Sequence, residues 1–297
     1  MTLNTETNSS ILPTNKVQAL YADLRKASLT SMAREIKQRS LKQRQDIIAR
    51  ERVRILDIEI DNMAASDFLQ QLNQGVVFTP NVDHVMKLRQ DAEFVRAYKQ
   101  ADYKICDSQI LLYASKFLGT PIKAKISGSD LLPMFCHHHR HNEQIKIFML
   151  GGAEGVAEQA RKNINARSGR EIIVQAHSPS YGFEQDEAEC QKIIDMIQSS
   201  GANVLVVGVG APKQEKWIAK YRHQLPSIDI FLAVGAAIDF EAGNKPRAPR
   251  YVSELGFEWL YRLMSEPRRL WKRYLLRDMP FLWMILQARL KREQRAS

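Results

Sequence analysis

Short apolar segments alternate with amphipathic ones between Val53 and residue 243 of this chain of 297 residues. The apolar segments are rich in Val, Ile and Leu, which is typical of buried strands. In the segments between them, apolar residues recur every three to four positions, as on one face of a helix. The predicted strands are 53–60, 76–79, 103–106, 145–150, 172–176, 203–208 and 228–234. The predicted helices are 64–73, 83–100, 109–117, 156–166, 186–199 and 213–224.

Strands that alternate with helices of this length form right-handed β-α-β units. The pattern therefore predicts an α/β, Rossmann-like core over residues 53–243, with a mostly parallel sheet and helices on both faces. The hydrophobic content of 44% is enough for a packed core. In such sheets ligands bind at the carboxyl ends of the strands, so the residues that follow each strand are the first candidates for a site.

An N-terminal extension, residues 1–52, precedes this core. It begins with a stretch rich in Asn, Thr and Ser and continues with a highly charged stretch whose apolar residues have helical spacing. We expect this extension to be helical or partly disordered. Its role stays open.

The C-terminal segment, residues 244–297, is basic and aromatic. It holds 13 Lys and Arg against 5 Asp and Glu, so it carries +8 of the chain's net charge of +10. Three of the four tryptophans, Trp259, Trp271 and Trp283, also lie there. Arginines beside indoles suit a phosphate-rich, half-apolar partner such as an anionic membrane surface. The apolar run 279–288 has about half the roughly 20 residues of a membrane-spanning helix, so we expect a helical appendage that lies on a membrane.

Cysteine usage and the N-terminus favour a cytoplasmic location. Cys106, Cys136 and Cys190 are scattered along the chain without a Cys-x-x-Cys pair, and residues 1–14 contain no apolar stretch of the signal-peptide kind. Together with the appendage, this predicts a cytoplasmic protein that is peripheral on the inner face of the cytoplasmic membrane. A homo-oligomer in solution is possible, because association could cover the apolar face of the appendage.

Polar and glycine-rich segments follow the predicted strands. They are Thr79–His84, Asp107–Gln109, Gly151–Gly155, Gly208–Glu215 and Gly235–Phe240. Each segment has a structural as well as a functional interpretation. Asp83 and Asp107 could be helix N-caps, since aspartate accepts a hydrogen bond from the first helical turn. Gly151 and Gly152 could bring backbone amides to a phosphate or simply make a tight turn, and Leu150 stands where a dinucleotide fingerprint has its first glycine.

No metal site is predicted. The residues His137–His139 and His141 form the only histidine cluster, but consecutive side chains on a helix diverge, and no carboxylate or cysteine completes a coordination spacing. The chain also lacks the Asp-x-Asp element with which many nucleotide-sugar enzymes hold a divalent ion. We expect no metal and no cofactor, so cationic side chains must neutralise any diphosphate leaving group.

The motifs from Val53 to Tyr274 resemble those of the WecG/TagA/CpsF glycosyltransferases of bacterial surface-polysaccharide assembly. The resemblance is carried by Thr79–His84, Cys106–Ser108, Ile126–Leu131, Phe148–Gly152, Gly208–Glu215, Val234–Gly235, Asp239–Phe240, Arg247–Pro249, Glu258–Leu263 and Glu266–Arg269. One departure is Lys125, because the family usually has an arginine before the Ser-Gly-Ser-Asp motif. Lysine cannot reproduce the bidentate geometry with which arginine binds phosphate.

The resemblance implies an inverting, metal-independent transferase. Its donor is a UDP-sugar, N-acetylmannosamine or its uronic acid or a related hexose, and its acceptor is an undecaprenyl-diphosphate-linked saccharide. Asp107 is then the general base. The residues expected to bind donor or acceptor are Thr79, Asn81, Lys125, Gly151, Gly152, Gln214, Asp239, Arg247, Arg262, Arg268 and Arg269. Among them the arginines of the appendage are expected to meet the diphosphate.

Two other function classes stay open from the residues alone. A nicotinamide-dependent oxidoreductase would use the same sheet, but it needs the full glycine fingerprint and an acidic residue after the second strand. A nucleic-acid-binding protein would account for the basic excess, but here the charge lies beside aromatics in a tail rather than on a recognition helix. The pattern therefore favours the transferase, with no nucleic-acid partner.

Overall fold

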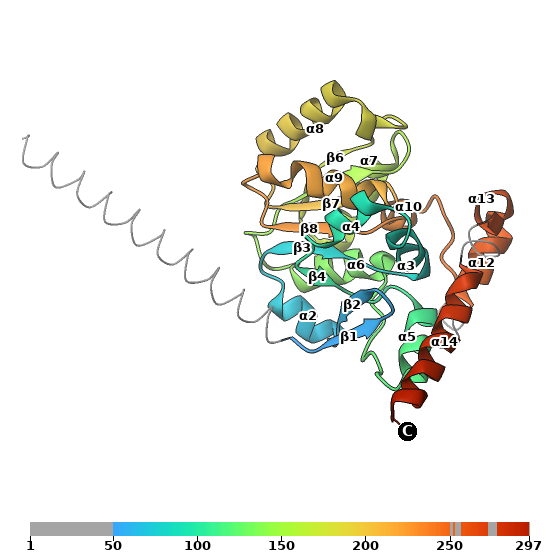
Figure 1. Cartoon of the computed structure of the whole chain (residues 1–297). Coiled ribbons are helices and arrows are strands. Elements are labelled where there is room, and N and C mark those ends of the chain that lie inside the picture. Colours follow the sequence, from blue (N-terminus) through green and yellow to red (C-terminus); the bar gives the residue numbers. More distant parts are fainter. Residues whose placement is uncertain (1–49, 250–251, 253–256, 273–277, 297) are drawn as a thin grey trace, which may run out of the picture. The chain divides into compact units, whose positions relative to one another are not determined.

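A six-stranded parallel sheet forms the centre of the fold (Figure 1). The structure is a computed structural model, and it describes residues 50–249, 252, 257–272 and 278–296. The predicted N-terminal extension lies almost entirely outside these residues. The strands of the sheet are β3 (Gly75–Phe78), β4 (Tyr103–Lys104), β5 (Ile147–Gly151), β6 (Ile173–His177), β7 (Val204–Gly208) and β8 (Ile230–Ala233), in the order β4-β3-β8-β7-β5-β6.

Successive residues of the strands enter two separate hydrophobic cores, one on each face of the sheet. In β5, Phe148 and Leu150 belong to one core while Ile147 and Met149 belong to the other. The first core is covered by α3 (Val82–Leu88), α4 (Ala92–Tyr98), α5 (Gln109–Phe117), α8 (Glu187–Ser199), α9 (Lys213–Tyr221) and part of α14 (Met279–Ala296). The second is covered by α2 (Ala65–Gln71), α6 (Gly128–His138), α7 (Val156–Ser168) and α10 (Ala237–Glu241). The predicted α/β class, with helices on both faces, is confirmed.

The first predicted strand, residues 53–60, is instead a hairpin outside the main sheet. Its two strands are β1 (Arg52–Ile55) and β2 (Ile58–Asp61), which pair antiparallel. Between them Leu56 has a φ of 50°, so the chain reverses there. A trace of this turn is present in the sequence, because the buried apolar positions change from odd numbers to even numbers across it.

Two helices differ from the prediction. The predicted helix 83–100 is divided into α3 and α4, because the Asp91 side chain accepts a hydrogen bond from the backbone N–H of Phe94 and starts a new helix. Helix α6 was not among the predicted elements. It begins after Ser127, whose side chain caps the backbone N–H of Asp130. Two short 3₁₀ turns, η1 (Phe183–Gln185) and η2 (Arg222–Gln224), complete the core.

The order of the strands brings the loops of the predicted site to one edge of the sheet. Because all strand pairs in the sheet are parallel, their carboxyl ends meet at that edge. The four central strands are β3, β8, β7 and β5, and each of them is followed by one of the polar or glycine-rich segments. The fold therefore collects the candidate residues of distant parts of the chain.

The appendage contains three helices in the described ranges, α12 (Glu258–Ser265), α13 (Pro267–Trp271) and α14. Its helical character was predicted. Helix α14 does not simply extend into solvent, since Phe281 and Ile285 are buried in the first core. Among the helices that the structure describes, none has both the length and the apolar character needed to cross a bilayer.

Candidate functional site

A pocket of about 630 Å³ lies at the carboxyl ends of β5, β6, β7 and β8. It is lined by 152–154 after β5, 179–184 after β6, 208–210 and Lys213 after β7, and Gly235, Ala236, Asp239 and Lys245 after β8. Gly152 and Asp239 are the two predicted site residues in this lining. A volume of this size suits a small organic ligand.

Glycines shape the wall of this pocket for two different reasons. A side chain on Gly151 would place its Cβ 2.5 Å from the carbonyl oxygen of Gly208, so β5 and β7 approach too closely for any other residue. Gly152 has a φ of +74°, in the left-handed region that favours glycine. Gly151 is therefore required by strand packing, whereas Gly152 exposes backbone to the pocket. A role of either glycine in binding a phosphate stays a prediction.

Paired charges line the pocket. The Lys213 Nζ lies 2.5 Å from Glu184 Oε1, and Lys245 Nζ lies 3.3 Å from Asp239 Oδ2 and 3.8 Å from Glu266 Oε1. Glu266 immediately precedes α13, so a residue of the appendage reaches the rim of the pocket. The sequence pattern did not select either lysine as a site residue, because only the fold brings the β6, β7 and β8 loops together.

Gln214 lies beneath the pocket rather than in its lining. Its side chain is 2% exposed, and its Oε1 accepts hydrogen bonds from the backbone N–H groups of Gly210 (3.3 Å) and Gly235 (3.1 Å). Its Nε2 donates to Glu215 Oε1 over 2.7 Å. One amide thus fixes the loops after β7 and β8 relative to each other, and both loops line the pocket.

The carboxyl group of Glu215 is fully buried. Burial raises its pKa from 4.5 to about 7, although Gln214 and the charge of Lys87 act in the opposite direction. The carboxylate of Asp83 is also buried, and it forms an ion pair of 2.6 Å with Lys87, which donates to the carbonyl oxygen of Ala211 over 3.0 Å. The ion pair of Asp83 and Lys87 therefore supports the loop after β7 through its contact with Ala211.

Asp107 lies at the β3 and β4 side of the same edge and is not part of the pocket lining. Its backbone N–H donates to the carbonyl oxygen of Pro80 over 2.9 Å, which ties together the loops after β3 and β4. The carbonyl oxygen of Cys106 accepts from the N–H of Ile126 over 2.7 Å, so the chain neighbours of these residues, Asp107 and Lys125, are brought near each other in space. The structure thus assembles the predicted base with two of the motifs expected around it.

Neither of the two aspartates is a helix N-cap. Helix α5 is capped by Ser108, whose Oγ accepts from the N–H of Leu111 over 3.3 Å. Helix α3 is capped by Asn81, whose Oδ1 accepts from the N–H of His84 over 3.2 Å. The capping interpretation of Asp83 and Asp107 is therefore wrong, and the requirement for a side chain at these helix ends is met by the neighbouring residues.

Thr79 connects the Asp107 side of the sheet edge, at β3 and β4, with the pocket side, at β5 to β8. It is buried, and its Oγ1 donates to the carbonyl oxygen of Ala233 at the end of β8 over 3.2 Å. The N-terminus of α6 also contacts β8, since a Cβ on Gly128 would lie 2.7 Å from the carbonyl oxygen of Val234. These contacts hold the Asp107 side and the pocket side in a fixed relation.

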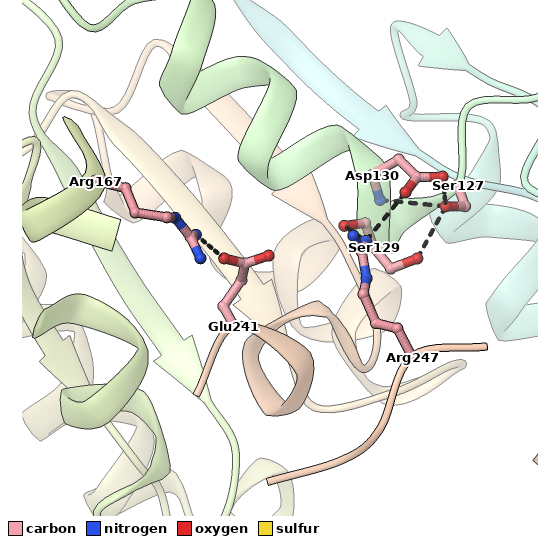
Figure 2. Close-up of polar contacts among 6 residues, drawn as sticks. All are labelled: Ser127, Ser129, Asp130, Arg167, Glu241 and Arg247. Atoms are coloured by element: carbon pink, nitrogen blue, oxygen red, sulfur yellow. Dashed lines mark hydrogen bonds and ion pairs between the residues drawn. The ribbon is translucent and has the colours of Figure 1, made fainter. Parts of the chain in front are cut away.

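Arg247 is bound to the N-terminus of α6 (Figure 2). Its guanidinium lies 3.0 Å from Asp130 Oδ1 and also donates to the carbonyl oxygen of Ser129. Asp130 is itself held by Ser127, whose Oγ donates to Asp130 Oδ2 over 2.5 Å. The predicted diphosphate-binding arginine is therefore paired with a carboxylate of the Ser-Gly-Ser-Asp motif.

The C-terminal end of α10 is held by contacts with α7. Glu241 is 6% exposed, and its carboxylate forms an ion pair with Arg167 of α7 (Figure 2). The side-chain amide of Asn163 donates to the backbone carbonyl of Glu241 over 2.8 Å. Since α10 also carries Asp239, these contacts fix a residue of the pocket lining.

The remaining predicted arginines lie in the appendage. Arg268 is exposed in α13. The side chains of Arg262 in α12 and Arg269 in α13 lie outside the part of the chain that the structure describes. Their role at the diphosphate stays a prediction. Within the described ranges, no group of three or more His, Cys, Asp or Glu side chains is placed so that it could hold a metal ion.

Comparison with known proteins identifies the family. Residues 53–295 match the model of the glycosyl transferase WecG/TagA/CpsF family. The chain belongs to this family. It is therefore a glycosyltransferase, which favours that reading over the oxidoreductase and nucleic-acid-binding alternatives.

Two curated relatives have the same function name, N-acetylglucosaminyldiphosphoundecaprenol N-acetyl-beta-D-mannosaminyltransferase. The relative from Bacillus spizizenii is 27% identical over 208 residues, which are 70% of this chain and 77% of the relative. The relative from Staphylococcus aureus strain MRSA252 is 27% identical over 250 residues, which are 81% of this chain and 94% of the relative.

Proposed function

We propose that this transferase moves N-acetylmannosamine, its uronic acid or a related hexose from a UDP-sugar to an undecaprenyl-diphosphate-linked saccharide during surface-polysaccharide biosynthesis. The observation that carries the proposal is the family match over residues 53–295, which includes every predicted site residue. The relatives named above act on an N-acetylglucosaminyl-diphosphoundecaprenol acceptor. The similarity extends over 94% of the Staphylococcus aureus relative, so it supports the same class of acceptor here.

The UDP-sugar occupies the pocket at the ends of β5 to β8. Its volume of about 630 Å³ is sufficient for a nucleotide-sugar. Gly152 offers backbone to the ligand, while Lys213 and Lys245 place positive charge in the lining. Asp239 supplies a hydrogen-bond acceptor for hydroxyl groups of the donor. A lining that combines exposed backbone, two lysines and three carboxylates, Glu154, Glu184 and Asp239, suits a charged and hydroxyl-rich molecule.

Asp107 acts as the general base. An acceptor hydroxyl is a weak nucleophile at neutral pH, so a carboxylate must take its proton while the oxygen attacks the anomeric carbon. The bond between that carbon and the diphosphate oxygen breaks, and UDP leaves with the electron pair. Attack opposite the leaving group inverts the configuration. The position of Asp107 supports this role, because it lies at the same edge of the sheet as the donor pocket but outside the pocket lining.

Cationic side chains neutralise the departing diphosphate without a metal ion. The candidates are the arginines of the appendage, Arg262, Arg268 and Arg269, together with Arg247. A guanidinium donates two parallel hydrogen bonds to a phosphate group, which is stronger than a single neutral contact. The pairing of Lys245 with Glu266 supports this arrangement, since it brings the start of α13 to the pocket rim.

The protein works as a peripheral protein on the inner face of the cytoplasmic membrane. Trp271 and Trp283 of the appendage are 42% and 62% exposed, in a segment with a net charge of +8. Exposed indoles beside basic residues bind the interface of an anionic bilayer. The lipid-linked acceptor of the relatives supports the same location.

A transfer assay tests the proposed function. Purified full-length protein is incubated with each of several UDP- and GDP-sugars and a lipid-diphosphate N-acetylglucosamine acceptor, and the product is identified by mass. We expect one UDP-linked N-acetylhexosamine or its uronic acid to extend the acceptor by one residue. Transfer only from a GDP-sugar, or only to an acceptor without a lipid diphosphate, would contradict the proposal.

A further inference from the structure

Large apolar side chains are exposed mainly on two neighbouring helices. Twelve such side chains are exposed in the ranges that the structure describes, two of them on α5 and five on α14. The α5 residues are Tyr113 and Phe117, and the α14 residues are Met279, Leu282, Trp283, Leu286 and Leu290. Four of the others lie between residues 257 and 271, and Tyr181 alone belongs to another part of this described surface. Helix α5 is part of the catalytic core, so the apolar surface extends beyond the appendage.

Helices α5 and α14 pack against each other (Figure 1). Phe281 and Ile285 of α14 enter the same hydrophobic core as Leu111 and Leu118 of the α5 region. This packing leaves the exposed residues of both helices on their solvent sides. The four-residue spacing of Tyr113 and Phe117 places both aromatics on one face of α5.

Arginines of α14 complete the junction at the C-terminal end of α5. Arg289 Nη1 donates to the carbonyl oxygen of Phe117 over 3.3 Å, and Arg292 Nη1 donates to that of Leu118 over 2.6 Å. Cations at this end of a helix bind its last carbonyl groups and the negative end of its dipole. The Arg289 guanidinium also lies 5.9 Å from the centre of the Phe117 ring. The aromatic surface of α5 is therefore continuous with the basic and apolar surface of α14.

The charges of this surface have one predominant sign. The sequences of α5 and α14 contain five basic residues and one acidic residue, Glu293. Arg289 forms an ion pair of 2.8 Å with that glutamate. A face with exposed aromatics, aliphatic side chains and a positive balance is complementary to anionic headgroups above an apolar interior.

We propose that α5 and α14 form one docking face for an anionic lipid bilayer, in which the core helix α5 inserts Tyr113 and Phe117. The proposal rests on the proposed function, because the bilayer is the surface that carries the lipid-linked acceptor. It adds a docking element within the core to the one in the appendage. Helix α5 begins just after Asp107 and has nine residues, so at about 1.5 Å per residue its docked end lies roughly 14 Å from the base.

Vesicle binding of a double variant tests the proposal. Full-length protein with Tyr113→Ser and Phe117→Ser is mixed with vesicles of phosphatidylglycerol and phosphatidylethanolamine and then sedimented. Since both side chains are about half exposed, the substitutions remove surface without opening the core. We expect roughly tenfold weaker binding than for the unchanged protein, from the apolar area that no longer inserts. Tyr181→Ser removes a fully exposed aromatic from another part of the surface and should leave vesicle binding unchanged.

A second measurement reports insertion directly. Cys106, Cys136 and Cys190 are buried, so Tyr113→Cys introduces an accessible thiol for an environment-sensitive fluorophore. We expect the label to shift to the blue on phosphatidylglycerol vesicles and not on phosphatidylcholine vesicles. The same label at Tyr181→Cys should not respond.

The outcomes separate this proposal from the proposed function. Turnover of the double serine variant on a water-soluble acceptor analogue should equal that of the unchanged protein, since neither residue lies in the site. If the unchanged protein transfers no sugar in the assay, the proposed function is overturned, but the result of the vesicle experiment still stands. Unchanged vesicle binding and a silent Tyr113→Cys label would overturn the docking proposal. A change of the double variant from oligomer to monomer in light scattering, with unchanged vesicle binding, would assign the face to self-association instead.

Discussion

The guanidinium of Arg247 and the carboxylate of Asp130 connect two parts of the chain that are 117 residues apart, with an Nη2 to Oδ1 distance of 3.0 Å. Asp130 belongs to the first turn of α6, and Arg247 belongs to the segment between α10 and α12, at the start of the appendage. Both side chains are nearly half exposed, at 44% and 45%. An ion pair of this exposure contributes about 1 kcal/mol or less to stability, so its position at the site matters more than its strength.

Arg247→Ala should therefore affect catalysis more than folding. We expect kcat/KM to fall by about tenfold or more if this arginine answers the charge of the leaving diphosphate. The free energy of unfolding should change by about 1 kcal/mol or less. Arg167→Ala is the matched control, because Arg167 is also exposed and paired with a carboxylate, that of Glu241 in α10. It should cost about 1–3 kcal/mol of stability by leaving a buried carboxylate without its partner, with little effect on turnover. The reverse pattern would place Arg247 among the structural residues.

Asp107→Asn should reduce kcat by about 100-fold or more while the KM for the donor stays nearly unchanged. The amide keeps the shape of the side chain but cannot accept the proton of the acceptor hydroxyl in the transition state. Steady-state kinetics with the donor and the lipid-diphosphate acceptor measure both quantities. Near-normal turnover would assign the base to another carboxylate, with Asp83 as the next candidate.

Glu215 should make stability depend on pH. Its folded pKa of about 7 is higher than its ordinary value of 4.5, so the folded protein binds this proton more tightly than the unfolded chain. The contribution of this group is therefore fully present below pH 4.5 and is lost as the pH rises to about 7. Over this window the free energy of unfolding should fall by about 3 kcal/mol at most because of Glu215.

Urea unfolding of Glu215→Gln between about pH 5 and pH 8 measures this effect. The neutral side chain should be less sensitive to pH than the unchanged protein and relatively more stable at the upper end of the range. Glu143→Gln changes an exposed carboxylate and serves as the control. Equal slopes for Glu215→Gln and the unchanged protein would show that this carboxyl group ionises normally.

Chelation should leave the reaction nearly intact. The chain has no Asp-x-Asp element, and we assign the diphosphate to arginines. Activity in EDTA should therefore stay within about twofold of the untreated enzyme. Abolition by EDTA with rescue by Mg²⁺ or Mn²⁺ would reject this assignment.

The sequence was sufficient for the fold class because its strands are buried on both faces. Val204–Gly208 is apolar throughout, and glycines or polar residues mark the ends of such runs. The pattern failed at 53–60, where a turn of two residues preserves the alternation but shifts its phase. It also placed one helix over α3 and α4, since the cap at Asp91 is a local signal within a continuous apolar period.

The candidate site was predictable only in part. The segments after β3, β4, β7 and β8 were recognised because polar residues at strand ends are conspicuous in the sequence. Lys213 lies in one of these segments, Gly208–Glu215, but like Lys245 it was not selected as a site residue, since a lysine near a helix end or in a loop has no distinguishing pattern. The buried amide of Gln214, expected to line the pocket, lies beneath it and joins two loops through contacts 4 and 21 residues apart in the chain. Such contacts depend on the tertiary fold.

The anomeric configuration of the product tests the central claim most directly, which is that the acceptor hydroxyl displaces UDP in one step with Asp107 as its base. The α-linked UDP-sugar that proves to be the donor is used in the transfer assay, and the new linkage is assigned by NMR from its one-bond carbon–hydrogen coupling. A β-linked product is the predicted result, since a single displacement inverts the anomeric carbon. An α-linked product would contradict the account, because it requires retention and hence a different role for Asp107.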